Sequence, residues 1–190
     1  MPLTRRAALM LPAALLALPR AARAAPAEVI EARVGLALEE LYREVPGAGQ
    51  RAARARGMLV MPKVVKGGFI LGGSYGEGAL RINTAAEDEA PAGGAYGPTA
   101  AYYSVAAASL GLQAGVQESR HVLFFLTTGA LERFRRSDGW EIGADAEVTM
   151  LDKGVSLGLD STAFQRPVVG FVFGESGLLL GASLEGAKYS

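Results

Sequence analysis

Basic side chains gather in one short stretch of the chain and are its best candidates for binding an anionic ligand. Between positions 51 and 66 they are Arg51, Arg54, Arg56, Lys63 and Lys66. Arg51 and Arg54 share a face if their stretch is helical, because residues three apart are neighbours on a helix. Lys and Arg near a membrane attract anionic lipid headgroups by roughly 1 kcal/mol each. The alternative is a solvated face that binds nothing.

Catalytic and metal-binding patterns are weak in this sequence. His121 is the single histidine and begins an apolar run, where we expect a structural role at a strand end. A hydrolase built on Ser74 and His121 is an alternative, although the sequence around Ser74 lacks the G-x-S-x-G pattern of a nucleophile elbow. One histidine and no cysteine cannot form a typical zinc site without carboxylates. We therefore predict no catalytic residue, metal or cofactor.

Acidic residues cluster in two places, and a pair in one of them could bind a cation weakly. Asp145 and Glu147 are two residues apart and share one face of an expected strand. Glu87, Asp88 and Glu89 fall in a polar loop. A structural role for the pair and a solvated run for the triplet are the simpler interpretations.

Seven glycines lie between residues 55 and 80 and suggest a phosphate-binding loop at first sight. Neither known motif is complete: a Walker loop would require Gly-Lys-Ser/Thr where Gly78 is followed by Ala79, and the dinucleotide fingerprint lacks its third glycine. Dense glycine in strand-like sequence instead indicates bulges, tight bends or close backbone approach. The stretch therefore predicts a strongly curved sheet.

The first 24 residues have the pattern of a cleavable export signal. Arg5 and Arg6 precede an apolar run over residues 7–18, and Ala22, Arg23 and Ala24 form an A-x-A cleavage pattern. The arginine pair fits twin-arginine export, and the general route stays open. We expect residues 25–190 to form one domain that is periplasmic or peripheral to the envelope membrane.

Removal of this segment changes the charge of the chain. The 190 residues carry 19 basic and 19 acidic side chains, and the first 24 contain four arginines and no acid. The processed chain therefore has 15 basic against 19 acidic residues, a net charge of −4. Such a protein has no overall attraction to nucleic acid or anionic membranes, so binding would need a local patch.

Hydrophobic spacing predicts helices first and strands afterwards. Apolar residues at three- and four-residue intervals indicate a helix over 27–45, and a short second helix follows over 48–55. A third helix is expected over 130–136, capped by Thr127 or Thr128. Strands are expected at 58–61, 64–71, 75–82, 101–108, 110–117, 121–126, about 145–150, 168–173 and 178–184. The fold class is α+β: N-terminal helices packed on a strongly curved, Gly-rich antiparallel sheet or partial barrel with one inserted helix.

Three ordered blocks of the chain resemble the SYLF lipid-binding domain family, also called the yeast-type actin-binding domain family. The blocks are residues 62–80, 103–117 and 126–146, and the resemblance extends over about residues 28–190. It implies binding rather than catalysis. Eukaryotic members are associated with phosphoinositide membranes and actin, and bacterial members are generally exported single-domain proteins.

Within this resemblance, Arg54, Arg56, Lys63 and Lys66 could correspond to the lipid-facing basic portion, and only the two lysines lie inside a matched block. An exported protein does not normally meet actin. We therefore expect a non-enzymatic, peripheral lipid-binding protein of the bacterial cell envelope. It would contact anionic phospholipid headgroups through its local basic patch, with shallow insertion of apolar side chains. The alternative is a structural module that binds an envelope protein partner through the curved sheet.

Overall fold

The computed structural model describes residues 24–68, 71–85, 91–110, 115–143, 149–150, 166–174, 177–178, 184 and 186–190. Residues 1–23 of the predicted export segment lie outside the described residues. The same holds for the acidic residues Glu87, Asp88, Glu89, Asp145 and Glu147. The alternative that Asp145 and Glu147 bind a cation therefore stays a prediction.

Two helices precede the sheet, as the sequence predicts. Helix α1 (Ala27–Glu44) buries one apolar stripe, formed by Ile30, Val34, Ala37, Leu38 and Leu41. The chain then turns at Gly47, whose φ of 81° lies in the left-handed region that glycine adopts readily. Helix α2 (Ala48–Arg54) follows, so both predicted helices are confirmed to within one residue at each end.

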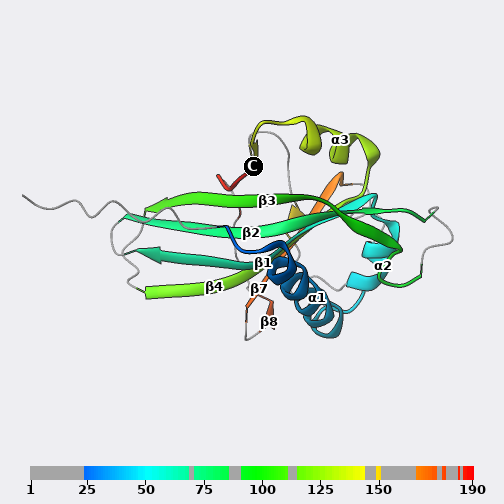
Figure 1. Ribbon diagram of the computed structural model, residues 1–190, viewed down its shortest axis with the longest axis horizontal. Helices are drawn as coiled ribbons and strands as arrows, with labels where there is room; N and C mark the ends of the chain where they lie inside the picture. Colours follow the sequence, from blue (N-terminus) through cyan, green and yellow to red (C-terminus); the bar gives the residue numbers. More distant parts are fainter. Residues whose placement is uncertain are drawn as a thin grey trace, which may run out of the picture.

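The remaining described chain forms one sheet and a third helix. Four long strands make its centre: β1 (Gly57–Gly68), β2 (Leu71–Asn83), β3 (Tyr96–Leu110) and β4 (Gly115–Phe125). Shorter strands follow: β5 (Trp140–Glu141), β6 (Thr149–Met150), β7 (Val168–Gly174), β8 (Gly177–Leu178) and β9 (Lys188–Tyr189). Their order is β5-β9-β3-β2-β1-β4-β7-β6, with β8 paired to β7. Among these described strands only β6 and β7 pair in parallel, which confirms an α+β fold with a curved antiparallel sheet (Figure 1).

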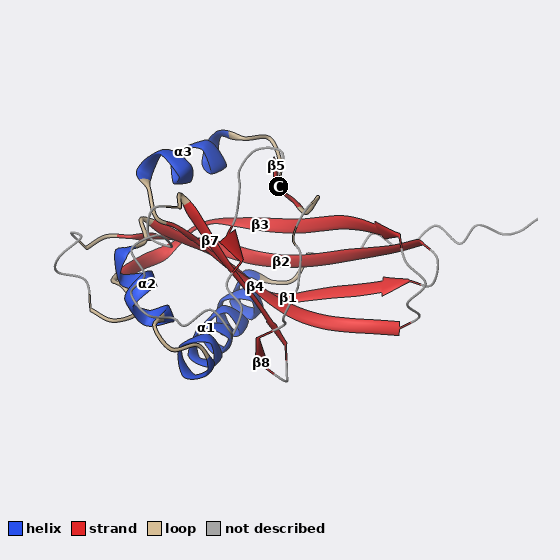
Figure 2. Cartoon of the chain, turned by 180° about the vertical axis from the view of Figure 1, so that it is seen from behind, coloured by secondary structure: helices blue, strands red, loops and turns tan. Residues whose placement is uncertain are grey.

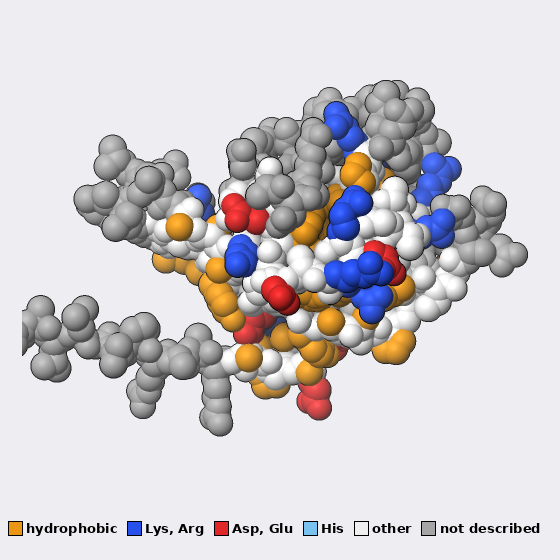
Figure 3. Space-filling view, turned by 90° about the horizontal axis from the view of Figure 1, so that it is seen from above, with side chains coloured by type: hydrophobic (Ala, Val, Ile, Leu, Met, Phe, Trp, Pro, Cys, Tyr) orange, Lys and Arg blue, Asp and Glu red, His pale blue; other side chains and the backbone are white. Residues whose placement is uncertain are grey.

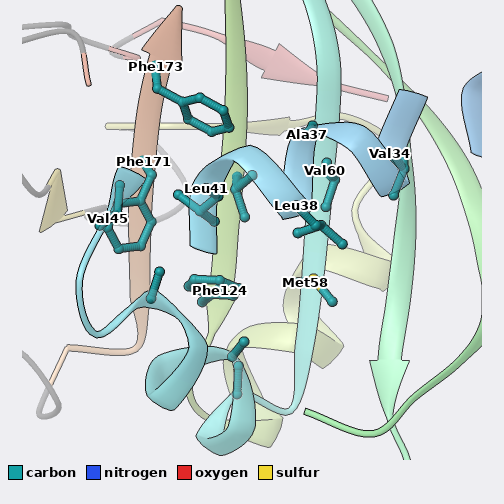
Figure 4. Packing of buried hydrophobic residues seen from close by; sticks show 14 of the residues in the cluster. Val34, Ala37, Leu38, Leu41, Val45, Met58, Val60, Phe124, Phe171 and Phe173 are labelled. Atoms are coloured by element: carbon teal, nitrogen blue, oxygen red, sulfur yellow. The ribbon is translucent and has the colours of Figure 1, made fainter. Parts of the chain in front are cut away.

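The central part of the sheet is covered on both faces, as the opposite positions of α1 and α3 in Figure 2 show. Helices α1 and α2 pack on one face, where Met58, Val60, Phe124 and Phe171 are buried (Figure 4). Helix α3 (Thr128–Arg136) lies on the other face, over side chains that include Leu59 and Phe125. Successive residues of a strand point to opposite faces, so each strand supplies both cores.

The third helix begins where the sequence predicts a cap. Thr127 is its N-cap residue, and the backbone N–H of Ala130 donates to the Thr127 Oγ1 at 3.2 Å. This bond satisfies one of the N–H groups that have no partner at a helix start. The inserted helix is therefore confirmed, with Thr127 rather than Thr128 as the cap.

Several predicted strand boundaries are wrong, including the start of β3, which lies five residues before the predicted strand 101–108. Strand β1 continues through Pro62 instead of stopping there, because Pro62 lies in a bulge where its missing N–H costs no ladder bond. Gly72, Gly73 and Ser74, expected as a link, pair with β1 inside β2. Strand β4 covers both the end of the predicted strand 110–117 and the start of 121–126, since its neighbours keep it paired throughout. Only β6 and β8 are described within the expected strands 145–150 and 178–184.

One extra residue in β1 forms the bulge at Met61 and Pro62. Val60 pairs with Ala79 and Lys63 pairs with Glu77, so three steps along β1 match two along β2. A side chain on Gly78 would overlap the carbonyl oxygen of Val60. This glycine therefore permits a close backbone approach, one of the roles that the sequence predicts for the glycine-rich stretch. The extra residue also reverses the alternation of faces along β1.

Candidate functional site

The four long strands continue beyond the helices as a region that we call the distal sheet: residues 65–68, 71–75, 106–110 and 115–118. Register brings them together, because Val65 lies opposite Tyr75 and Glu118, and Tyr75 lies opposite Ala106. None of the side chains described in this region is buried. Figure 1 shows these strand ends projecting past all three helices. The distal sheet is therefore available for contact on both faces.

The face of the distal sheet on the α1 side is mostly apolar, with Glu118 as its charged residue. Val65, Tyr75 and Val116 are 36, 47 and 77 % exposed, and the small side chains of Ala106 and Ala108 lie on the same face. They share it because paired residues, and residues two apart along a strand, point the same way. Figure 3 shows hydrophobic side chains along this narrow part of the described surface. Grouped exposed apolar side chains of this kind mark an interaction surface.

Of the two lysines of the predicted basic patch, Lys66 belongs to the distal sheet and Lys63 adjoins it, and they point to opposite faces. Lys63 lies on the α1 side, where its Nζ is 2.6 Å from Glu118 Oε2. Lys66 comes three residues later and therefore lies on the other face, opposite Ser74 and Gln117. Both lysines are exposed. Because exposed ion pairs are weak, Lys63 can exchange Glu118 for an external anion.

The three arginines lie elsewhere in the fold. Arg51 is buried in α2, its Nη1 donates to the Gly47 carbonyl at 3.3 Å, and burial lowers the pKa of its guanidinium. Arg54 is exposed at the end of α2, and Arg56 is half-buried just before β1. The ten steps along the chain from Arg56 to Lys66 span about 30 Å when the chain is extended. The structure thus does not gather the five predicted residues into one patch, and their binding roles stay predictions.

His121 is a buried residue of β4 at the boundary between the covered and uncovered parts of the sheet. Its Nε2 lies 3.1 Å from Ser119 Oγ, and its Nδ1 lies 3.5 Å from the Tyr189 hydroxyl. Burial lowers the pKa of His121 to about 4, so the ring is neutral at pH 7 and a weak base.

The hydroxyl that meets this histidine is that of Ser119, not Ser74 as the hydrolase alternative requires. Ser74 belongs to β2, which lies on the other side of β1 from β4. It pairs with Lys66, whose partner in β4 is Gln117, four residues before His121. Ser119 and His121 are two residues apart in β4, and residues two apart in a strand point to the same face. This spacing in the sequence could have indicated Ser119 as the serine beside His121.

A pocket with a volume of about 160 Å³ lies where the chain enters α1 and meets the distal sheet. Its walls include Ala25, Ile30 and Arg33 on one side and Lys63, Val65, Tyr75 and Glu77 on the other. The Ala25 backbone N–H donates to Glu77 Oε2 at 2.8 Å, and the Tyr75 hydroxyl donates to Oε1 at 2.9 Å. The segment before α1 is thereby attached to β2.

A second polar contact attaches α1 to strands β2 and β3 through Glu31. It was not predicted from the sequence. The Glu31 carboxylate accepts hydrogen bonds from Arg81 at 2.6 Å, from Tyr102 at 3.1 Å and from the Thr99 hydroxyl. Burial raises the pKa of Glu31, but these hydrogen bonds outweigh it and the pKa lies below its usual value. The contact joins residues at least 50 positions apart, so no local pattern could have revealed it.

Neither a candidate membrane-spanning helix nor a candidate metal-binding cluster occurs among the described residues. None of the helices that the structure describes is both long enough and apolar enough to span a membrane. Within the same residues, no group of three or more histidine, aspartate or glutamate side chains could hold a metal ion.

Comparison with protein-family models gives a match over residues 106–190 to Ysc84, described as Las17-binding protein actin regulator. This confirms the family that the sequence resembles. The match takes in the third block and most of the second, and it begins in the distal part of β3. The first block, with Lys63 and Lys66, lies outside the matched residues. A search of the curated proteins finds no match to this chain.

Proposed function

Because residues 106–190 belong to the Ysc84 (SYLF) family of binding domains, we propose that this chain is a peripheral lipid-binding protein of the bacterial cell envelope. The distal sheet is the surface that meets the membrane, and anionic phospholipid headgroups are the ligand. One observation carries the proposal: three exposed apolar side chains and two exposed lysines lie at the uncovered end of one sheet.

Val65, Tyr75 and Val116 supply the apolar contact. Amphipathic surfaces of this kind bury their apolar side chains shallowly at the boundary between headgroups and acyl chains. Tyr75 suits this position, because its ring is apolar and its hydroxyl is polar. Lys63 and Lys66, on opposite faces, reach phosphate groups on either side of the inserted strands. The net charge of −4 after processing restricts attraction to this region, so binding is sensitive to salt.

The proposed role is binding without chemistry. The family is a binding family, and His121, buried and neutral, forms part of the core. The family description names actin regulation, which we do not extend to an exported chain. A protein partner in the envelope is the other occupant that the distal sheet could accept, and the experiment below separates the two.

The charge contribution is tested by co-sedimentation with vesicles of phosphatidylcholine containing increasing phosphatidylglycerol, at several salt concentrations. Binding should increase with the anionic fraction and decrease with salt. Lys63→Glu combined with Lys66→Glu should weaken binding roughly tenfold or more, since each basic residue contributes about 1 kcal/mol near a membrane. Arg43→Glu combined with Arg133→Glu is the matched control, because both arginines are exposed, lie on helices and give the same change of charge.

The apolar contribution is tested by Val65→Ser, Tyr75→Ser and Val116→Ser in one chain. This variant should lose most vesicle binding, because each substitution removes apolar surface from the membrane contact. Leu36→Ser is the control, since Leu36 is 65 % exposed on α1, outside the distal sheet. Unchanged binding in both distal-sheet variants would place the contact elsewhere. Absence of binding to every vesicle would contradict the lipid proposal and favour a protein partner.

A further inference from the structure

We propose that hydrolysis of the Ala24–Ala25 peptide bond creates an N-terminal ammonium group whose binding site is the Glu77 carboxylate. The inference concerns maturation of the chain and does not depend on lipid binding. Ala22 and Ala24 are the small residues that an export endopeptidase selects at the third and first positions before its cut. Ala24 is exposed and non-helical, and α1 begins only at Ala27, so the bond is accessible.

The receiving site is already formed in the uncut chain. The Ala25 nitrogen is 2.8 Å from Glu77 Oε2, and the half-buried position of Ala25 shields this contact. The Tyr75 hydroxyl holds the second oxygen, Oε1, at 2.9 Å. Each carboxylate oxygen therefore has a donor, and the carboxylate is oriented toward the nitrogen that the cut would release.

Hydrolysis changes what this nitrogen can offer. One water molecule is consumed, its hydroxyl goes to the Ala24 carbonyl as a new carboxylate, and the Ala25 nitrogen becomes an amine that takes up a proton. The amide of the uncut chain has one N–H, whereas the ammonium has three and carries a full positive charge. A charge-assisted hydrogen bond is roughly twice as strong as a neutral one. The Ala25–Glu77 contact therefore becomes an ion pair without any required movement.

The groups around the Ala25 nitrogen leave Glu77 as the carboxylate that can balance the positive charge of the new ammonium group. Arg33 and Lys63 line the same pocket, and the N-terminal end of α1 carries the positive end of the helix dipole. Glu118 is engaged by Lys63, and Glu28 lies in the first turn of α1. Tyr75 stays neutral at pH 7, because burial and its bond to Glu77 raise its pKa. Glu77 is thus the carboxylate in contact with Ala25, and its removal should matter once the chain is cut.

The first experiment exports the full chain in a bacterial host and determines the N-terminal residue of the periplasmic protein by intact mass and Edman degradation. The expected first residue is Ala25. Any other first residue, or an uncut chain, overturns the proposal.

The second experiment measures the reactivity of the new amine in the processed protein and in its Glu77→Gln variant. An acetylating reagent at pH 7 attacks only the unprotonated amine, so a pKa raised by one unit slows the reaction about tenfold. The Ala25 amine should therefore react about tenfold more slowly in the natural protein than in the Glu77→Gln variant. Glu44→Gln is the control and should leave the rate unchanged, because Glu44 is exposed at the opposite end of α1. Equal rates with and without Glu77 overturn the ammonium site, even if Ala25 is the first residue.

Thermal unfolding at several pH values also tests the ion pair, because the direction in which its contribution to Tm changes with pH can be predicted. A folded-state pKa raised above the unfolded value of about 7.7–8.0 stabilises the protein below that pH, and the stabilisation is lost as pH rises through the folded pKa. The natural processed protein should therefore exceed Glu77→Gln in Tm by about 2–4 °C at pH 6. That difference should decrease as the pH rises toward 10. A difference that is the same at both pH values would contradict the ion pair.

Discussion

The covered and uncovered parts of the same four strands differ in what their residues contact. In the covered part, which we call the sheet body (residues 57–61, 79–82, 103–105 and 121–125), buried side chains pack against α1 and α2 on one face and α3 on the other. In the distal sheet, described side chains are small, polar or exposed. Strand β4 shows both, since Val116 is 77 % exposed and Phe124 is fully buried. The comparison indicates that stability comes from the sheet body and leaves the distal sheet free to bind.

The largest expected effect is the loss of a core aromatic ring from the sheet body. Phe124 packs edge-on against Phe171 at a centroid distance of 5.7 Å. Phe124→Ala should lower the free energy of unfolding by about 3–5 kcal/mol, because it removes buried apolar surface and leaves a cavity. Urea denaturation of Phe124→Ala and of Val116→Ala measures how much a side chain of the sheet body and one of the distal sheet contribute to the free energy of unfolding. Val116→Ala should stay within about 0.5 kcal/mol of the natural protein. Similar losses in the two variants would contradict the comparison.

The pH dependence of stability tests the burial of His121, which lies at the boundary between the sheet body and the distal sheet. Its pKa is about 4 in the folded protein and near 6.5 when unfolded, so unfolding takes up a proton between these values. Stability should therefore fall by about 3 kcal/mol as pH decreases from 6.5 toward 4, because each unit between the two pKa values is worth about 1.4 kcal/mol. Urea denaturation at several pH values checks this. His121→Gln should remove most of that pH dependence, and an unchanged slope would place the acid-sensitive group elsewhere.

A smaller effect should separate two glycines of β2. Gly78→Ala should cost about 1–3 kcal/mol, because the new methyl group would overlap the backbone of Val60 at the bulge. Gly73→Ala should be nearly neutral, since its nearest neighbour, the Ala107 carbonyl oxygen, would be 3.5 Å away. Equilibrium unfolding of both variants measures the difference. Equal costs would mean that the bulge can relax and does not require glycine.

Much of the local structure could be predicted from the sequence because its causes are local. The spacing of Val34, Leu38 and Leu41 makes α1 amphipathic, and Thr127 caps α3 through a residue three positions away. The sequence blocks also identified the family, which the match over residues 106–190 confirms. The strand boundaries at Pro62 and between 110–117 and 121–126 could not be predicted, since they depend on pairing with distant strands.

The sequence by itself determined the composition of the candidate site: a run of cations near glycine-rich strands, with no cysteine and one histidine. Tertiary structure decided which of these side chains share a surface. The bulge at Pro62 places Lys63 and Val65 on the α1 side and Lys66 on the other, while packing of α2 buries Arg51. Register likewise brings Ser119 rather than Ser74 to His121 and places Glu77 beside Ala25. The physical reason is that helix periodicity and capping act within a few residues, whereas strand partners and bulges are set by contacts between segments far apart in the chain.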